Sequence, residues 1–243
     1  MFPKLINYPK CNQYLIGFIL ICIANQLNCK KSSTPSVDQN NLSIKTVFVN
    51  GSLNVRAEPL LKAAVVFSLK EGEQVNILKE LDEFLIVNKI SGKWTEIEFQ
   101  NQSGWVFGGF LSRFPYPKNC SSLYDYVTKN FKPSSPPEII EKGKLYGRDT
   151  EAYRQTTQFY WENQVSLIDK SMYEAGSTEI ILMNASLYEG YFIGVNCQSE
   201  FKNDKFLPDT RIQSIKLKHP DWYHYLKIEK RKNGISISYL SAI

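Results

Sequence analysis

The most constraining feature of this sequence is a series of short strand-like segments between residues 44 and 114. Apolar and polar residues alternate in these segments, as in 53–56 and 93–99, and no helical spacing of apolar residues interrupts them. Turn-forming residues such as Asn50-Gly51 separate one segment from the next. Short strands joined by tight turns predict a small closed barrel or a sandwich.

Four motifs in this region resemble the bacterial SH3 (SH3b) domain and follow one another in the order of that family. They are Leu53-Asn54-Val55-Arg56 with Pro59, Leu69 with Glu71-Gly72, Trp94 with Ile97, and Gly104-Trp105-Val106 with Phe110-Leu111. The resemblance covers under a third of the chain and implies an SH3-like barrel that binds a ligand without catalysis. The main departure from the family is the stretch 80–91, which is longer than usual.

The same resemblance suggests where a ligand binds. On the segment 93–99, Thr95, Ile97 and Phe99 share one face and Trp94 lies on the other. If the first face fills the core, Trp94 points outward, onto the surface that carries the ligand in SH3 families. The positions resembling Phe107 and Phe110 lie beside it, so Trp94, Phe107 and Phe110 are the predicted ligand-binding residues. The alternative is that residues 80–91 cover Trp94, which then serves packing.

The N-terminal residues 1–28 are expected to be a lipoprotein-type signal peptide. They contain Lys4 and Lys10, no acidic residue, and an apolar run at 14–24 that is shorter than the roughly 20 residues needed to span a bilayer. Cys29 resembles the lipidated first residue of a bacterial lipoprotein, and spirochaetal lipoproteins, whose consensus is looser, resemble this pattern better than the usual consensus does. A short uncleaved anchor and a buried helix are the alternatives. Polar residues 29–43 then form a flexible tether.

The cysteines agree with export. Of the five, Cys11 and Cys22 lie in the predicted signal and Cys29 takes the lipid. Cys120 and Cys197 are left in the folded part, either as one disulfide or as two free thiols. We therefore expect an exported, membrane-anchored lipoprotein, periplasmic or on the cell surface.

Residues 115–243 resemble no family that we recognise. Their pattern predicts a β-rich α+β domain, so the predicted fold class of the chain is mainly β. Ser121 or Ser122 is expected to cap a short helix, and the proline-containing stretch 132–137 to form a linker. Strands are expected at 165–167, 179–183, 191–195 and 211–217. The last expected element is a hairpin of 223–230 with 235–240, joined across Asn233-Gly234.

Catalytic and nucleic-acid-binding signals are weak. His219 and His224 have no recognised zinc spacing, and neither a nucleophile elbow nor a glycine-rich phosphate loop occurs. The formal charge of +5 is mild and the longest basic run is Lys230-Arg231-Lys232, so nucleic acid is not an expected partner. The prediction is a protein with no catalytic residue, no metal and no cofactor.

The functional expectation is a lipid-anchored envelope protein whose SH3b module recognises peptidoglycan or another envelope protein. A second hypothesis is a structural or adhesin-like lipoprotein whose function lies in the C-terminal domain. A third is a cell-wall hydrolase of a type that the motifs do not identify.

Overall fold

The computed structural model describes residues 43–144, 151–160, 164–171, 175–203, 208–220 and 223–242. The predicted signal peptide, most of the tether and Cys29 lie outside the described residues. Within these residues no helix is long and apolar enough to cross a membrane. The described residues all belong to one compact unit.

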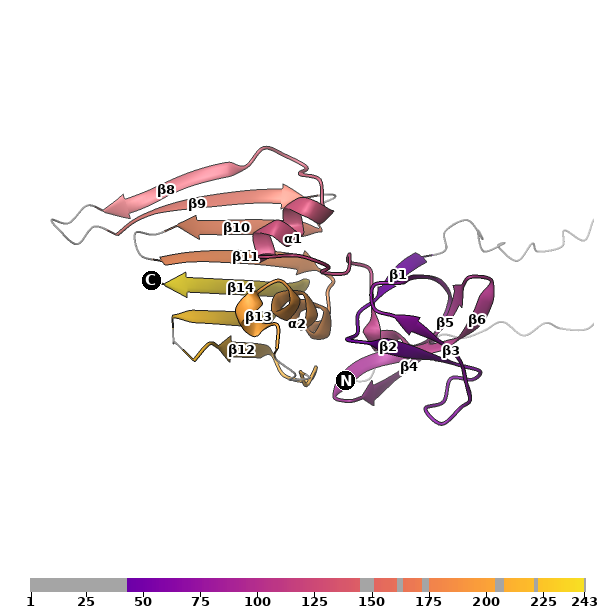
Figure 1. The fold of residues 1–243 in the computed structure, drawn as a ribbon. Helices are drawn as coiled ribbons and strands as arrows, with labels where there is room; N and C mark the ends of the chain where they lie inside the picture. Colours follow the sequence, from indigo (N-terminus) through magenta and orange to yellow (C-terminus); the bar gives the residue numbers. More distant parts are fainter. Residues whose placement is uncertain are drawn as a thin grey trace, which may run out of the picture. The chain divides into compact units, whose positions relative to one another are not determined.

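A first, seven-stranded antiparallel sheet curls into the predicted barrel (Figure 1). Its strands are β1 (Ser43–Val47), β2 (Ser52–Arg56), β3 (Val65–Lys70), β4 (Gln74–Val87), β5 (Ile90–Phe99), β6 (Gln102–Phe107) and β7 (Leu111–Ser112), with the 3-10 helix η1 (Gly108–Phe110) before β7. The strand order is β3-β2-β6-β5-β4-β1-β7. The alternation of apolar and polar residues along the strands explains which side chains fill the barrel. On β2, Leu53 and Val55 are buried while Asn54 between them is exposed.

The stretch 80–91, which departs from the SH3 family, lengthens the hairpin of β4 and β5 into an arm. Pairing breaks at a bulge between Glu80 and Phe84 and resumes from Phe84 opposite Lys93 to Val87 opposite Ile90. On the outer part of β4, Leu85 and Val87 pack against the core that contains the C-terminal domain, whereas Phe84 and Ile86 are exposed. The arm therefore has one packed face and one free face.

A second seven-stranded antiparallel sheet forms most of the C-terminal domain, in the order β12-β13-β14-β11-β10-β9-β8. Its strands are β8 (Glu138–Lys144), β9 (Glu151–Tyr160), β10 (Val165–Ser171), β11 (Ala175–Met183), β12 (Ser214–Lys218), β13 (His224–Arg231) and β14 (Gly234–Ala242). The helices α1 (Leu123–Asn130) and α2 (Leu187–Asn196) lie on one face of it, and the 3-10 helix η2 (Ser199–Phe201) follows α2 (Figure 1). The mainly β fold class, with an SH3-like barrel before a β-rich domain, is confirmed.

The first helix begins as predicted. Ser122 is the N-cap of α1, and its hydroxyl accepts a hydrogen bond from the amide of Asp125 at 3.0 Å. The stretch 132–137, predicted to be a linker, contacts the second sheet. The amide of Ser134 donates to the carbonyl of Phe159 at 2.9 Å, and Pro133 forms a bridge with Tyr160. These residues therefore follow the edge of the sheet at β9.

The prediction of a strand at 191–195 is wrong, because these residues lie in α2. A capping box starts this helix, in which Ser186 and Glu189 each bond the other's backbone amide. The residues from Leu187 to Val195 are all buried, so apolar residues occupy every side and no helical period is visible. A Cβ built on Gly190 would lie 2.5 Å from Cγ2 of Ile235, which shows how closely α2 approaches the sheet.

The C-terminal hairpin is confirmed, with a turn one residue earlier than expected. Arg231 pairs with Gly234, so Lys232 and Asn233 form the turn and Gly234 begins β14. Gly234 has φ of +153° and its Cα faces the carbonyl of Leu182, which explains the need for glycine there. Strand β12 likewise begins at Ser214 rather than at residue 211.

Cys120 and Cys197 form a disulfide, the first of the two alternatives for this pair. Cys120 precedes α1 and Cys197 is the C-cap residue of α2. The bond therefore ties together the two helices that cover one face of the second sheet.

Candidate functional site

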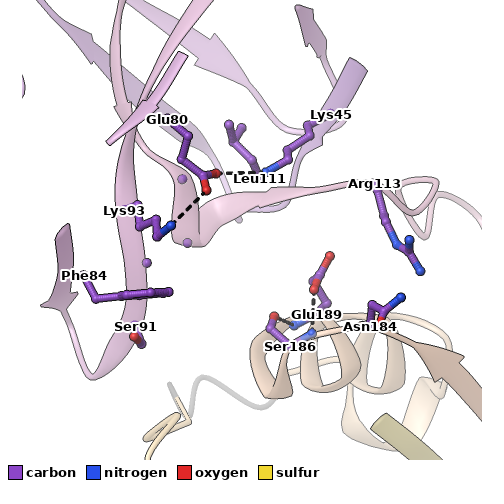
Figure 2. A pocket seen from close by; sticks show the side chains of 13 residues that line it. Lys45, Glu80, Phe84, Ser91, Lys93, Leu111, Arg113, Asn184, Ser186 and Glu189 are labelled. Atoms are coloured by element: carbon purple, nitrogen blue, oxygen red, sulfur yellow. Dashed lines mark hydrogen bonds and ion pairs between the residues drawn. The ribbon is translucent and has the colours of Figure 1, made fainter. Parts of the chain in front are cut away.

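The described residues form a cavity of about 270 Å³ (Figure 2). One wall is the free face of the β4–β5 arm, and the other consists of Arg113, the turn after β11 and the first turn of α2. The bottom is backbone from Gly92, Gly108 and Gly109. Elements from both domains therefore line the same cavity.

The wall from the arm combines an aromatic ring with charged groups. The Nζ atoms of Lys45 and Lys93 lie 3.4 and 3.5 Å from the two carboxylate oxygens of Glu80. Phe84 is 68% exposed, and Nζ of Lys93 lies 4.8 Å from the centre of its ring. Because Phe84 and Lys93 are cross-strand partners, the hairpin register itself sets this contact.

The opposite wall is centred on Glu189. One of its carboxylate oxygens accepts from the amide of Ser186 at 2.7 Å, and the other accepts from the hydroxyl of Ser112 at 2.7 Å. Arg113 donates to the carbonyl of Met183, and its guanidinium carbon lies 4.9 Å from the centre of the Phe114 ring. The capping carboxylate of α2 therefore also bonds the barrel strand β7.

The bottom of the cavity is bare backbone because larger residues do not fit. A Cβ on Gly92 would lie 2.5 Å from the amide nitrogen of Gly109 and 2.8 Å from Cζ of Phe107. Phe107 thus lies directly behind the glycines. A ligand in the cavity would meet peptide groups there instead of side chains.

The predicted ligand-binding residues are close together, but their side chains are buried or half-buried. Trp94 is 8% exposed and Phe107, its cross-strand partner, 4%. The half-buried ring of Phe110 lies 5.3 Å from that of Phe107 and 5.5 Å from that of Tyr188. This burial favours the packing alternative for Trp94, while ligand contact by the three residues stays a prediction.

The cavity nevertheless lies beside the predicted positions. Lys93 precedes Trp94, and Gly108 and Gly109 lie between Phe107 and Phe110. Sequence reasoning missed Phe84, because it stands in the continuous apolar run 84–87, which does not indicate which face is exposed. It also missed Arg113 and Glu189, since their proximity depends on how the two domains pack.

Hydrogen bonds hold the two walls in place. The hydroxyl of Tyr188 on α2 donates to the carbonyl of Phe48 at 2.7 Å. Burial, with smaller effects of Tyr191 and Tyr116, raises the pKa of Tyr188 well above its ordinary value, so this hydroxyl remains a donor. At the tip of the arm, the amide of Thr210 donates to the carbonyl of Lys89 at 2.9 Å.

Metal ligation is not indicated in the described part of the chain, where no group of three or more His, Cys, Asp and Glu side chains is arranged to hold an ion. His224 instead contacts its neighbours through Nδ1, which lies 3.0 Å from the hydroxyl of Tyr239 and 3.5 Å from a carboxylate oxygen of Glu200. This cluster is separate from the cavity lining.

Comparison with known proteins identifies the first domain. No curated protein matches the chain, but residues 51–112 match the family model described as the bacterial SH3 domain. The match contains Phe84 and Lys93 and ends just before Arg113, so one wall of the cavity, apart from Lys45, belongs to the matched segment and most of the other wall does not. On this evidence, with the barrel topology, residues 51–112 are a bacterial SH3 domain.

Proposed function

We propose that this chain is a non-catalytic binding protein of the bacterial envelope that recognises peptidoglycan through the cavity beside its SH3 domain. The observation that carries the proposal is the exposed ring of Phe84, flanked by Lys93 and Glu80 on the free face of the arm. Bacterial SH3 domains are binding modules that often take peptidoglycan or proteins as ligands.

The chemistry of the cavity suits a glycan that carries peptides. The C–H face of a sugar ring packs well on an exposed aromatic ring, while charged groups and backbone amides hydrogen-bond hydroxyl and peptide groups. The volume of about 270 Å³ is near the lower end of the roughly 300–1,000 Å³ typical of small-molecule sites. It suits one or two units of a longer polymer, not a whole chain.

The proposal includes an anchor. A lipid on Cys29, followed by the polar tether, would hold the SH3 domain near a membrane and within reach of the wall. Export and anchoring rest on the N-terminal sequence pattern alone. The protein would then act as a connection between membrane and wall, periplasmic or at the surface.

Co-sedimentation of the full-length protein, purified in detergent, with purified peptidoglycan sacculi tests this function. Phe84→Ala should weaken binding about tenfold because it removes the exposed ring. Ile86→Ala is the matched control, since Ile86 is 54% exposed on the same face of β4 but does not line the cavity. Trp94→Ala should chiefly lower the melting temperature, because this side chain is buried.

Two results would contradict the proposal. One is wild-type protein that stays in the supernatant with sacculi at every concentration tested. The other is equal binding by the wild type and Phe84→Ala, which would move the site away from this cavity. A folded Trp94→Ala variant that alone loses binding would instead support the predicted aromatic site.

A further inference from the structure

Some of the charged side chains that line the cavity form ion pairs with one another, and others do not. Lys45 and Lys93 lie on either side of Glu80, and these three groups form one exposed ion-pair cluster. Glu189 on the other wall is held by the hydroxyl of Ser112 and the amide of Ser186. Among the described residues, no carboxylate forms an ion pair with Arg113.

Arg113 is both positioned and accessible. Its bond to the carbonyl of Met183 and its contact with the Phe114 ring fix the direction of the guanidinium. The residue is exposed, and Figure 2 shows its guanidinium on the same side of the cavity as Asn184 and Glu189, opposite Phe84 and Lys93. Because a guanidinium has five N–H donors, several are left after the bond to Met183.

We infer that Arg113 binds a carboxylate of the same ligand that packs a sugar ring on Phe84. This inference rests on the proposed function and names the part of peptidoglycan that is recognised, a free carboxylate on its peptide portion. The planar fork of a guanidinium matches the two oxygens of a carboxylate, and such charge-assisted bonds are stronger than neutral ones. Glu189 lies on the same wall, but its two carboxylate oxygens already accept hydrogen bonds from the amide of Ser186 and the hydroxyl of Ser112.

Recognition is then shared between two parts of the molecule. The SH3 domain supplies the ring of Phe84, whereas Arg113 follows the matched segment and is held by the carbonyl of Met183 in the C-terminal domain. The packing of the two domains therefore sets the distance between the Phe84 ring and the Arg113 guanidinium. A ligand that keeps its sugar ring but has an amidated carboxylate would bind weakly.

The test compares untreated sacculi with sacculi whose carboxylates have been converted to amides by carbodiimide and ammonia. The full-length wild type should bind the amidated sacculi roughly 10- to 100-fold more weakly, and Arg113→Gln should show the same loss on untreated sacculi. Arg231→Gln is the matched control, an exposed arginine on β13 that pairs with Glu179 and Glu229 outside the cavity. Circular dichroism and the melting temperature establish that each variant is folded.

Arg113→Lys is a control for loss of the hydrogen bond to the carbonyl of Met183, because it keeps the positive charge but not the planar guanidinium. Its affinity for untreated sacculi should lie between those of the wild type and Arg113→Gln. Arg113→Gln and wild type should also bind amidated sacculi equally. If the wild type binds untreated sacculi but neither amidation nor Arg113→Gln weakens binding, the inference fails and the proposed function stands. If amidation alone weakens it, another cation reads the carboxylate and the assignment to Arg113 is wrong. If the wild type binds neither preparation, both fail.

Discussion

The two domains bury different kinds of core. The barrel encloses a small aliphatic cluster that includes Val55, Leu69 and Ile97. The core of the C-terminal domain is larger and rich in aromatic residues, and it extends onto the outside of the barrel, where it includes Phe48 and Phe107. The first core is closed within its own domain, whereas the second is completed by the first domain.

This difference shows how the SH3 domain packs against the rest of the chain. The ring of Phe48 stacks on Phe192 of α2 with centroids 5.0 Å apart, and Phe110 meets Tyr188 edge to face. Side chains on the outer surface of the barrel thus pack against α2 and are not available as a broad ligand face. In the proposed function, the exposed face of the arm, with Phe84, takes the place of that surface. We expect the two domains to unfold together, because a continuous core joins them.

The largest effect is expected from the disulfide. Replacing Cys120 and Cys197 together by alanine opens a loop with a sequence separation of 77 residues. Loss of a crosslink over a loop of this length should lower the free energy of unfolding by about 4 kcal/mol. Urea denaturation followed by circular dichroism measures the loss.

The control is the double variant with and without dithiothreitol, whose stability should not depend on the reductant, whereas the wild type should lose stability when reduced. The shape of the transition tests the comparison between the domains. One transition shifted as a whole agrees with a continuous core. Two transitions, of which only one shifts, would show that the barrel folds independently of the C-terminal core.

A smaller effect is expected from Gly190→Ala in α2. The new Cβ would lie 2.5 Å from Cγ2 of Ile235 and 2.9 Å from Cγ2 of Ile228, so the helix or these side chains must shift. Such overpacking outweighs the better helix propensity of alanine, worth about 1 kcal/mol, and we expect a net loss of about 2 kcal/mol. Urea denaturation is again the measurement.

Gly176→Ala on β11 is the matched control, because its Cβ would meet nothing nearer than the carbonyl oxygen of Lys170 at 3.6 Å. Its stability should stay near that of the wild type. Equal stability of wild type and Gly190→Ala would mean that α2 does not pack tightly on the sheet, and the aromatic core would then be looser than the aliphatic one.

The same difference between the cores explains what the sequence could predict. Barrel strands have one face in the core and one in solvent, so Leu53 and Val55 alternate visibly with polar neighbours. Their partners are mostly close in sequence, and Gly72 marks a turn with φ of +75°. Local pattern was therefore sufficient for the SH3 domain, and the strong hairpin signal sufficed for β13 and β14.

Elements packed on more than one side could not be predicted in this way. Helix α2 is buried around its circumference, so its apolar run resembled a strand, and only the Ser186 and Glu189 capping box marked a helix start. The arm was recognised as a departure from the family, but its use for docking depends on Leu85 and Val87 meeting distant residues. The cavity was missed for the same reason, since Arg113 and Glu189 come together only through the packing of α2 on the barrel.

The smallest effect tests the junction of the two cores directly. Tyr188→Phe keeps the ring against Phe110 but removes the hydrogen bond to the carbonyl of Phe48, which should cost about 1 kcal/mol. Tyr126→Phe is the control, because its buried hydroxyl donates to the carbonyl of Pro115 at 2.9 Å and not to the carbonyl of Phe48. Both variants should lose similar stability by urea denaturation.

Hydrogen exchange separates the two variants. The amide of Phe48, which donates to the carbonyl of Phe110 at 2.8 Å, lies at the junction. It should exchange faster than in the wild type when Tyr188 is changed, and to a smaller extent when Tyr126 is changed. Equal acceleration in both would mean that this amide exchanges only through global unfolding, so the junction would be as stable as the whole molecule. An unchanged rate in Tyr188→Phe, together with lost stability, would show that the hydroxyl stabilises α2 alone, and the barrel and the C-terminal domain would then have separate cores in contact.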